Sequence, residues 1–445
     1  MPDPAYAKLA DDLAAEISAG RLKPGQRLPP QRTFAYQRGI AASTASRVYG
    51  ELLRRGLVVG EVGRGTFIAG RSQLPAPTEP GAAAVDLEFN FPILPQQFES
   101  IARSLAGLNR PDALRIALSI APSRGGAALR QVAARLLSRG GWQPNPEGLF
   151  FTGNGRQAIA VAAGALVPIG GRLGVEAITY PLVKGLAARL GISLVPIALD
   201  DEGIRPDAIA RAHRKAPLSA VYLQPALHNP LGVTLTRGRR DELVRVLGSL
   251  GLMAIEDTVY GFLCDEPPLA ALAPERSIVI DSLSKRIAPG LAVGFVHAPI
   301  ALRERLTAAV RSGGWGAPAY ALQAAQRMIA DGTVDAIAVM KRQDAEKRQR
   351  LAAECLAGFQ VRADSRAYHL WLTLPEPWRS EAFVAAAARR GIALTPSSAF
   401  AVGPGHAPNA VRLALASPPI ERLREALLSL ARLLSAGEEA SDVTE

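Results

Sequence analysis

Cysteine is almost absent from this sequence, and long apolar runs are missing altogether. Only Cys264 and Cys355 occur among 445 residues, which excludes a disulfide framework and a multi-cysteine metal site. No apolar run approaches the ~20 residues that a membrane-spanning helix requires. The first residues, MPDPAYAKLADDLAAEI, carry three aspartates and lack the basic stretch and apolar core of a secretory signal. Together these absences predict a cytoplasmic protein that does not enter a membrane.

Acidic residues are in the minority. The chain has 51 Lys and Arg against 40 Asp and Glu, a net charge of +11. Residues 1–72 contain 11 basic and 6 acidic residues, so about a sixth of the chain carries +5 of that charge. This excess favours a polyanionic partner such as nucleic acid. A solvated basic surface would have the same composition, so charge alone does not decide between the two.

The length predicts two or three domains, and composition marks one boundary. Residues 71–84 include QLPAPTEPGAAA, a Pro-rich stretch without apolar periodicity that is typical of a linker. We expect a DNA-binding domain in residues 1–70 and a larger domain in residues 85–435, in which apolar strands alternate with helices. A smaller C-terminal subdomain is expected over about 325–435, and residues 436–445 form an acidic tail.

The first domain has the pattern of short helices followed by a hairpin. Apolar spacing predicts helices over residues 4–19, 31–39 and 43–55, then two short strands within residues 57–69. Pro30 is expected in the first turn of the second helix, Gly39 at its end and Ser43 as the cap of the third. Three helices and a β-wing describe a winged helix-turn-helix.

The third helix would present small polar side chains and an arginine at its N-terminal end. Such groups meet phosphates and base edges when a helix enters the major groove of double-stranded DNA. A small helical domain with an exposed basic face could instead bind protein. The residues expected to contact DNA are Arg32, Ser43, Thr44, Ser46, Arg47, Arg64 at the wing tip, and Thr66.

The sequence motifs of this segment favour DNA binding over protein binding. The stretch LPPQRTFAYQRGIAASTASRVYGELLRRGLVVGEVGRGTFIAG resembles the GntR-type winged helix, whose members contain LP-x-x-R-x-L-A and end in G-x-G-T-F-V. The resemblance covers essentially all of residues 5–70. It departs where Phe34 replaces the usual leucine and where residues 36–38 replace a more apolar stretch.

In the larger domain, one lysine has a context suited to an aldehyde cofactor. Lys285 lies in VIDSLSKRIAPGLAVGF, where an apolar strand meets a turn rich in serine, proline and glycine. A lysine amine forms a Schiff base when its surroundings favour the neutral form. A lysine beside serines is otherwise a solvated surface residue, so the prediction depends on what lies upstream.

Pyridoxal 5'-phosphate (PLP) also needs a phosphate site, a carboxylate at its pyridine nitrogen, a donor to its ring oxygen and a surface over its ring. The strand–turn–helix FTGNGRQAIAVAAGAL supplies backbone N–H groups for phosphate at Gly155, Arg156 and Gln157, unless the turn merely connects two elements. Tyr180, which could be ordinary core, and Asn229, which could be a simple Asn-Pro turn, follow two further strands.

A carboxylate follows a third strand. Asp257 ends the apolar strand LMAIED, and a protonated pyridine nitrogen would be a suitable partner for a carboxylate buried there. An aspartate at this position could instead cap the helix that follows.

These motifs occur in the order in which the fold-type-I aminotransferases have them, and residues 85–435 resemble that family. Its recurring motifs are N-P-x-G, [ED]-D-x-Y and S-x-S-K-x-x-x-P-G-L-R-x-G. The resemblance implies an α/β domain with a mostly parallel central sheet and a smaller C-terminal α+β subdomain. It implies that Lys285 carries the Schiff base, that Asp257 pairs with the pyridine nitrogen, and that Asn229 and Tyr260 contact the ring oxygen. Tyr180 would stack on the ring. The residues implied for phosphate are Gly155, Arg156, Gln157, Ser282 and Ser284. Arg412, in NAVRLALAS, matches the arginine that grips a substrate carboxylate, although it could be a structural arginine on a strand.

Two departures from that family concern the phosphate. The arginine of PGLR is Ala292 here, and Arg286, next to the lysine, is the candidate to replace it. The family also has a tyrosine, contributed to the partner subunit's phosphate site, at about the position of Ile120. We therefore expect PLP to bind, but more loosely, by about 2–4 kcal/mol.

A GntR-type winged helix fused to this fold resembles the MocR-type regulators over nearly the whole chain. That resemblance implies a transcription regulator that responds to PLP, with or without an amino-group effector, and binds two half-sites of a DNA operator. It also implies a domain-swapped homodimer in which each winged helix is carried over its partner. The alternatives are an active aminotransferase with an accessory DNA-binding domain, and a domain that no longer binds PLP and serves only for dimerisation.

Overall fold

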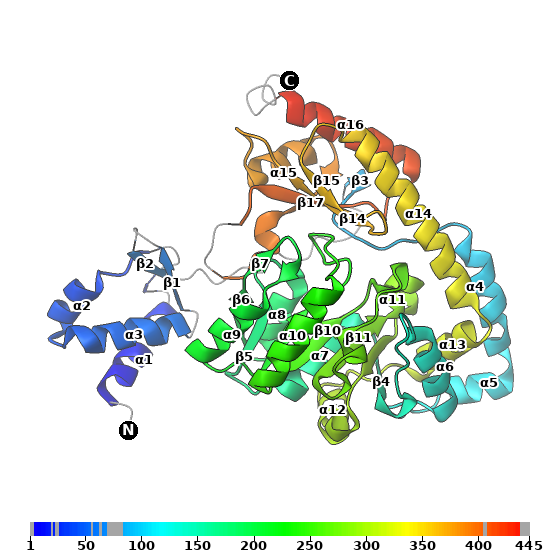
Figure 1. Ribbon diagram of the computed structural model, residues 1–445, viewed down its shortest axis with the longest axis horizontal. Helices are drawn as coiled ribbons and strands as arrows, with labels where there is room; N and C mark the ends of the chain where they lie inside the picture. The colour runs from blue at the N-terminus through cyan, green and yellow to red at the C-terminus, as the bar shows by residue number, and fades with distance from the viewer. Residues whose placement is uncertain are drawn as a thin grey trace. The chain divides into compact units, whose positions relative to one another are not determined.

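The structure of the chain is a computed structural model (Figure 1). It describes residues 4–18, 21–22, 26–54, 57–61, 65–68, 83–403 and 407–436. Arg64, most of the predicted linker and the predicted tail beyond Ala436 lie outside these residues. The chain forms two compact units, and the boundary between them falls between Thr78 and Glu79.

The first unit contains helices and a small antiparallel hairpin. The helices are α1 (Pro4–Ser18), α2 (Gln31–Arg38) and α3 (Ala42–Arg54), and the strands are β1 (Val58–Glu61) and β2 (Gly65–Ile68). A short segment pairs with the second strand, because Leu28 N–H donates to Thr66 O at 2.8 Å and Ile68 N–H to Gln26 O at 2.8 Å. The predicted order of helices and wing strands is confirmed.

Two details of the predicted helix ends are wrong. Pro30 precedes α2 as its N-cap and is not in its first turn. α3 begins one residue before Ser43, because Ala41 O already accepts hydrogen bonds from the N–H groups of Thr44 and Ala45. Ser43 therefore lies inside the first turn and does not cap it. The end of α2 is as predicted, with Gly39 in the left-handed conformation (φ 62°).

The larger side chain at position 34 is accommodated by an aromatic neighbour. Phe34 is buried and packs edge-on against Tyr49, with ring centroids 5.3 Å apart. The Tyr49 hydroxyl donates to Pro29 O at 2.6 Å, which fixes the turn before α2 to α3. The larger side chain therefore lies in the core of this unit.

The second unit is built on a mixed, mostly parallel sheet of order β4-β12-β11-β10-β9-β5-β6. Every neighbouring pair is parallel except those that involve β12, which runs antiparallel to both of its neighbours. The strands are β4 (Leu149–Thr152), β5 (Arg172–Glu176), β6 (Ser193–Ile197), β9 (Ala220–Leu223), β10 (Met253–Asp257), β11 (Ser277–Ser282) and β12 (Gly294–His297). The predicted mostly parallel sheet is confirmed.

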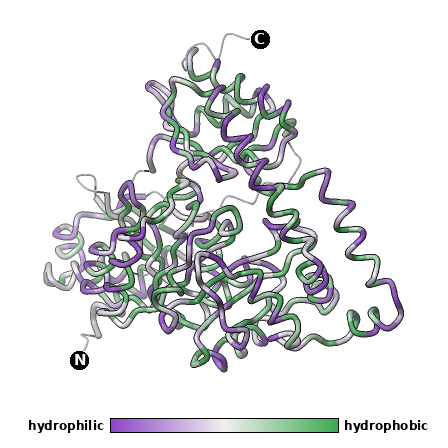
Figure 2. Tube along the Cα trace, turned by 45° about the vertical axis from the view of Figure 1, so that its right-hand side comes forward, coloured by the Kyte–Doolittle hydropathy of each residue, from purple (hydrophilic) through white to green (hydrophobic). Residues whose placement is uncertain are grey.

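Helices cover both faces of this sheet, so its central strands are buried along nearly their whole length. The N-terminus of α7 follows directly from β4, and most of this helix is buried. Hydrophobic and hydrophilic residues alternate along the surface helices (Figure 2). The α-helices of this part of the chain, both surface and buried, are α4 (Gln97–Ala106), α5 (Pro111–Ala117), α6 (Ala127–Leu137), α7 (Gly155–Leu166), α8 (Pro181–Arg189), α9 (Pro206–Lys215), α10 (Arg237–Leu250), α11 (Leu283–Arg286), α12 (Arg303–Ser312) and α13 (Ala319–Ala330). A small hairpin, β7 (Leu199–Asp200) and β8 (Gly203–Ile204), follows β6.

A second, antiparallel sheet of order β13-β14-β17-β16 forms the predicted C-terminal α+β part. Its strands are β13 (Val361–Ala363), β14 (His369–Thr373), β16 (Thr395–Pro396) and β17 (Ala410–Ala414). The helices of this part are α14 (Thr333–Cys355), α15 (Ser380–Arg389) and α16 (Ile420–Ala436). The start of the unit joins it as well, because β3 (Val85–Asp86) pairs in parallel with β15 (Ile392–Ala393).

Among the described residues, no helix combines the length and the apolar character that crossing a membrane demands.

Candidate functional site

The predicted site residues of the second unit follow the carboxyl ends of strands. Gly155 begins α7 after β4, Tyr180 precedes α8 after β5, and Asp257 ends β10. Asn229 follows β9, and Lys285 follows β11 in the short helix α11. These strands all point the same way, so their carboxyl ends lie along one edge of the sheet, where α/β folds bind their ligands.

Lys285 is half-buried and faces groups of this site. Its Nζ donates to Asn90 O at 2.5 Å and lies 3.4 Å from the centre of the Phe91 ring and 5.9 Å from that of Tyr260. Burial, together with the positive charges of Arg412 and other basic neighbours, holds the pKa of Lys285 well below its usual range. An amine in this environment is neutral more often than a surface lysine, which is what a nucleophilic amine needs.

Asp257 is a buried carboxylate without a basic partner. Its Oδ2 accepts from the Tyr222 hydroxyl at 2.7 Å, and its Oδ1 accepts from Val259 N–H at 3.1 Å. Within the described part of the chain, no basic side chain forms an ion pair with it. Burial raises its pKa from 3.8 to about 6, and the hydroxyl of Tyr222 opposes that rise. The bond to Val259 N–H is a short-range contact of the kind that a helix cap makes, whereas Oδ2 is bonded, among the described residues, only to the neutral Tyr222 hydroxyl.

Asn229 and Tyr260 are buried at the same edge. The backbone of Asn229 is held by Gln224, whose side chain accepts from Asn229 N–H and donates to Asn229 O, both at 3.3 Å. Among the described residues, the buried Oδ1 of Asn229 has no hydrogen-bond partner. The Tyr260 hydroxyl accepts from Asn90 Nδ2 at 2.9 Å.

The turn before α7 is organised by a reciprocal cap. Asn154 Oδ1 accepts from Gln157 N–H at 3.0 Å, and Gln157 Oε1 accepts from Gly153 N–H at 2.8 Å. The N–H of Gln157 is thus already bonded, which contradicts its prediction as a free phosphate donor. The N–H groups of Gly155 and Arg156 occupy the first helical positions, which have no intrahelical acceptor.

Two close approaches bring this turn against the end of β11 and the start of β12. A Cβ on Gly155 would lie 3.2 Å from Ser282 Cβ, and one on Gly294 would lie 2.3 Å from Asn154 O. Ser282 Oγ accepts from Ser284 N–H at 3.1 Å and lies 2.9 Å from Ser284 Oγ. The structure therefore brings Gly155, Ser282 and Ser284 together as one polar concentration beside the start of α7.

Arg286 points elsewhere, and the prediction that it replaces the missing phosphate arginine is wrong. Its Nη2 pairs with Asp281 Oδ2 at 2.7 Å and its Nε with Oδ1 at 3.3 Å. Both side chains are buried, and the guanidinium lies 5.4 Å from the Phe262 ring centre. A bidentate buried pair of this kind fixes the arginine in place, because separating it would leave a buried charge unpaired.

Arg412 and Tyr180 also belong to this cluster. Arg412 is buried on β17, and its Nη2 donates to Glu88 O at 2.7 Å and to Thr395 Oγ1 at 2.9 Å. Its charge lowers the pKa of Lys285 and opposes the rise of the pKa of Tyr260, which places the guanidinium near both. Tyr180 is half-buried; burial raises its pKa, and the charge and hydrogen bond of Arg156 oppose that rise.

Three residues of this site were missed in the sequence: Asn90, Tyr222 and Lys341. Lys341, on α14, is fully buried, and its Nζ donates to Lys285 O at 2.9 Å and to Ile287 O at 2.7 Å. Burial lowers its pKa to about 7. One signal was available, because Lys341 falls on the apolar face of its helix with Val334, Ala338 and Ala345. Asn90 and Tyr222 lie in stretches whose pattern predicts only loop and core.

In the first unit, the predicted DNA contacts are mostly exposed. Arg32, Ser43, Ser46 and Arg47 are exposed, while Thr44 and Thr66 are half-buried.

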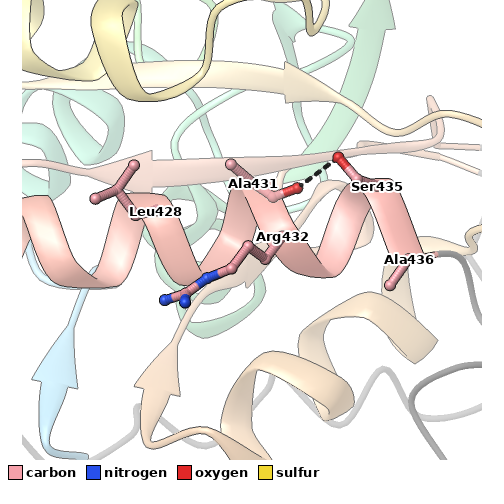
Figure 3. Close-up of a pocket in the computed structure, with 5 residues that line it drawn as sticks. All are labelled: Leu428, Ala431, Arg432, Ser435 and Ala436. Carbon is pink, nitrogen blue, oxygen red and sulfur yellow. Dashed lines mark hydrogen bonds between the residues drawn. The ribbon is translucent and has the colours of Figure 1, made fainter.

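The surface of α16 has a depression that is separate from this cluster (Figure 3). All of its lining residues come from this one helix, and none of them is a predicted site residue. They are Leu428, Ala431, Arg432, Ser435 and Ala436. The Ser435 hydroxyl is bonded to Ala431 O at 3.1 Å, so the depression offers one charged group and a largely apolar floor.

Two protein families match this chain, one over each of its two units. Residues 99–430 match aminotransferase class I and II, and residues 5–68 match the bacterial regulatory proteins of the gntR family. The chain therefore belongs to the aminotransferase class I and II family, and it carries a GntR-type helix-turn-helix domain before it. This combination is the MocR architecture.

Proteins with both parts are known in bacteria. The chain is 29% identical over 438 residues to the uncharacterized HTH-type transcriptional regulator YdeF of Bacillus subtilis, covering 97% of this chain and 94% of that protein. It is 25% identical to the HTH-type pyridoxine biosynthesis transcriptional regulator PdxR of Corynebacterium glutamicum, covering 97% and 96%.

The second unit also resembles solved enzymes. An archaeal alanine:glyoxylate aminotransferase superposes with a TM-score of 0.71 at 22% identity, covering 80% of this chain and 91% of that one. At this identity the likeness shows the fold alone.

The raised pKa of Asp257 leads to a prediction about how stability depends on pH. Because the pKa of Asp257 is raised from 3.8 to about 6, the folded state binds its proton more tightly than the unfolded state does. In the PLP-free protein, the free energy of unfolding should therefore fall as the pH rises from about 4 to 6, and two pKa units correspond to about 3 kcal/mol. Asp257→Asn should remove that loss, so the variant should gain about 2–3 kcal/mol relative to the wild type between pH 4 and 7.

Urea unfolding followed by tryptophan fluorescence measures this difference. All four tryptophans lie in the second unit, so the signal reports on that unit alone. A difference between variant and wild type that does not change with pH would contradict the assigned environment of Asp257.

Proposed function

We propose that the protein is a transcription regulator that binds DNA through its winged helix and PLP through its aminotransferase-like domain. The observation that carries the proposal is the meeting of Lys285 and Asp257 at one sheet edge, in a chain that begins with a GntR-type domain. Neither group forms an ion pair among the described residues, although both are desolvated. A ligand with an aldehyde and a basic ring nitrogen answers both needs.

The residues present fit PLP part by part. The Lys285 amine would bind its aldehyde carbon, and the Asp257 carboxylate would pair with its ring nitrogen. The buried Asn229 side chain and the Tyr260 hydroxyl would contact the ring oxygen, with Tyr180 over the ring. The phosphate would lie at the start of α7, held by Gly155 and Arg156 N–H groups and the hydroxyls of Ser282 and Ser284. PLP, when bound, supplies a carbonyl that reacts reversibly with amines.

The same site supports regulation better than turnover. Ala292 is at the position of an expected phosphate arginine, and Arg286 is committed to Asp281 and does not replace it. During turnover the covalent bond between the lysine and the cofactor is broken, so an enzyme must hold the cofactor through its phosphate. A sensor instead benefits from reversible binding. The nearly complete set of ring contacts favours aminotransferase activity as the second candidate. Steady amino-group transfer to a keto acid would establish that second function.

A homodimer follows from an exposed apolar stretch. Ile116, Leu118 and Ile120 are 54%, 76% and 98% exposed within five residues of chain, at and just after the end of α5. Large apolar side chains gathered in this way mark an interaction surface. The aminotransferase resemblance assigns the position of Ile120 to the contact with the partner subunit. We therefore propose that a second copy of this chain covers the stretch, and that the winged helices of the dimer read two half-sites.

An effector and a cellular location complete the proposal. Arg412 lies beside Lys285 and would bind the carboxylate of an amino-group effector held at the same site. By linkage, that effector changes DNA affinity only if it binds the two arrangements of the dimer differently. A regulator of transcription acts where the chromosome is, so we place the protein in the cytoplasm.

For the cofactor, we expect purified protein to acquire the visible absorption of lysine-bound PLP and Lys285→Ala not to acquire it. Ala292→Arg should tighten PLP about tenfold or more, because a charge-assisted hydrogen bond to phosphate is restored. Titration of each protein with PLP, followed by absorbance, measures both effects. Ala292→Gln is the matched control of similar length without charge. Equal affinities of the Arg and Gln variants would contradict the assigned phosphate position.

For DNA, we expect Arg47→Ala to weaken binding about tenfold or more, since a guanidinium contact to a base or phosphate is lost. The target duplex is first selected from random sequences with the wild-type protein and then titrated by fluorescence anisotropy. Gln37→Ala changes an exposed residue of α2 outside the predicted contact set and serves as the control. Equal losses in both variants, or none in Arg47→Ala, would rule out the proposed recognition helix.

For the dimer, Leu118→Glu should raise the dimer dissociation constant at least about tenfold, because a charge is placed in an apolar interface. Sedimentation over a concentration series gives this constant directly. Ile169→Glu is the matched control, since Ile169 is 90% exposed outside this stretch. A wild type that sediments as a monomer, or a Leu118→Glu variant that dimerises normally, would refute the interface.

A further inference from the structure

The segment 86–91, here called the strap, runs along the cluster from the start of the second unit. The Asp86 carboxylate accepts from the N–H groups of Glu88 and Phe89 at 2.8 and 3.0 Å, which folds the strap into a tight turn. Leu87 ties it to the C-terminal part, since its N–H donates to Ala393 O and its carbonyl accepts from Ala414 N–H. The strap is therefore ordered by specific bonds.

The strap engages the Lys285 amine from two sides. Asn90 O accepts from Lys285 Nζ at 2.5 Å, and the Phe91 ring centre lies 3.4 Å from the same nitrogen. A carbonyl accepts an N–H of the amine in either protonation state, and an aromatic face stabilises the protonated form when water is excluded. An amine that binds a carbonyl carbon of a ligand must give up both contacts.

The strap also engages Arg412. Nη2 carries two N–H groups, and they donate to Glu88 O and Thr395 Oγ1. A carboxylate that binds a guanidinium through two parallel hydrogen bonds uses Nη2 in either of its two orientations. Such a ligand must therefore displace one of these acceptors, and Glu88 O is the one that belongs to the strap. The adjacent Nε is buried and has no partner among the described residues.

A third contact reaches Tyr260, whose hydroxyl accepts from Asn90 Nδ2. The strap thus binds three of the groups proposed to hold PLP or its effector, through two main-chain carbonyls and two side chains.

We propose that the strap is a built-in competitor for the ligand site: its carbonyls and the Phe91 ring occupy the Lys285 amine and the Arg412 guanidinium, so that binding of PLP or of a carboxylate-bearing amine releases it. The inference rests on the proposed function. It adds a conformational change to that function. The strap comes after residues 71–84 in the chain, and these connect it to the unit that carries the winged helix. Release of the strap is then the first structural consequence of ligand binding.

Hydrogen exchange on the full chain, with and without PLP, tests the release. PLP should speed exchange at the Glu88 and Phe89 amides, by about threefold or more, because the turn that protects them opens. In Lys285→Ala, the same concentration of PLP should leave these amides unchanged. Slower exchange of the strap in PLP-bound wild type would overturn the proposal.

The affinity of Phe91 variants for PLP provides a second test of the proposal. Phe91→Ala should bind PLP about 3- to 30-fold more tightly than the wild type, since the ring no longer competes for the amine. Phe91→Leu keeps most of the volume without the aromatic face and should fall between them. Unchanged or weaker binding in Phe91→Ala would overturn the proposal, and the exchange result on the wild type decides the matter if that variant does not fold.

The outcomes separate the two proposals. Lys285-dependent PLP binding without release of the strap refutes the strap and leaves the proposed function intact. PLP binding by Phe91→Ala alone, with none in the wild type, is the extreme form of the competition. No PLP binding by either protein refutes both.

Discussion

A buried carboxylate and a half-buried amine, neither in an ion pair with any described residue, impose the constraint on which the second unit depends. Asp257 and Lys285 are each desolvated at the carboxyl edge of the sheet, and the pKa of each is displaced toward its neutral form. Desolvated charges of this kind are costly unless a partner is provided. The Tyr222 hydroxyl donates to Asp257 and the Asn90 carbonyl accepts from Lys285, so neutral groups hold both in place without neutralising them. The fold thus maintains a site that a basic, carbonyl-bearing ligand would complete.

The elements around this edge divide the work of positioning. The close approach of Gly155 to Ser282 joins the start of α7 to the end of β11 and gathers the anion-binding groups. Lys341 reaches across from α14 to hold the carbonyl of Lys285, so the helix of the C-terminal part sets the backbone that carries the amine. The buried Arg286–Asp281 pair anchors the same short helix from its other side. That pair also keeps Arg286 away from the phosphate role that Ala292 leaves open.

Much of this could be predicted from the sequence, because its motifs are local. A strand that ends in Asp257 or Asn229, and a glycine turn before a helix, each place their residues by backbone geometry alone. Predictions failed where a side chain had a choice of partners. The Gln157 N–H donates to the Asn154 side chain and the Arg286 guanidinium donates to Asp281, each within five residues.

Asn90 and Tyr222 could not be predicted at all. Their roles arise from contacts between segments far apart in the chain, and Asn90 lies 195 residues from Lys285. The central claim, that the lysine site governs the winged helix, is tested most directly by the affinity for the selected DNA as PLP is titrated into wild type and Lys285→Ala. The account predicts a change of at least about fivefold in the wild type and none in the variant. Equal DNA affinity in both proteins, with and without PLP, would contradict it.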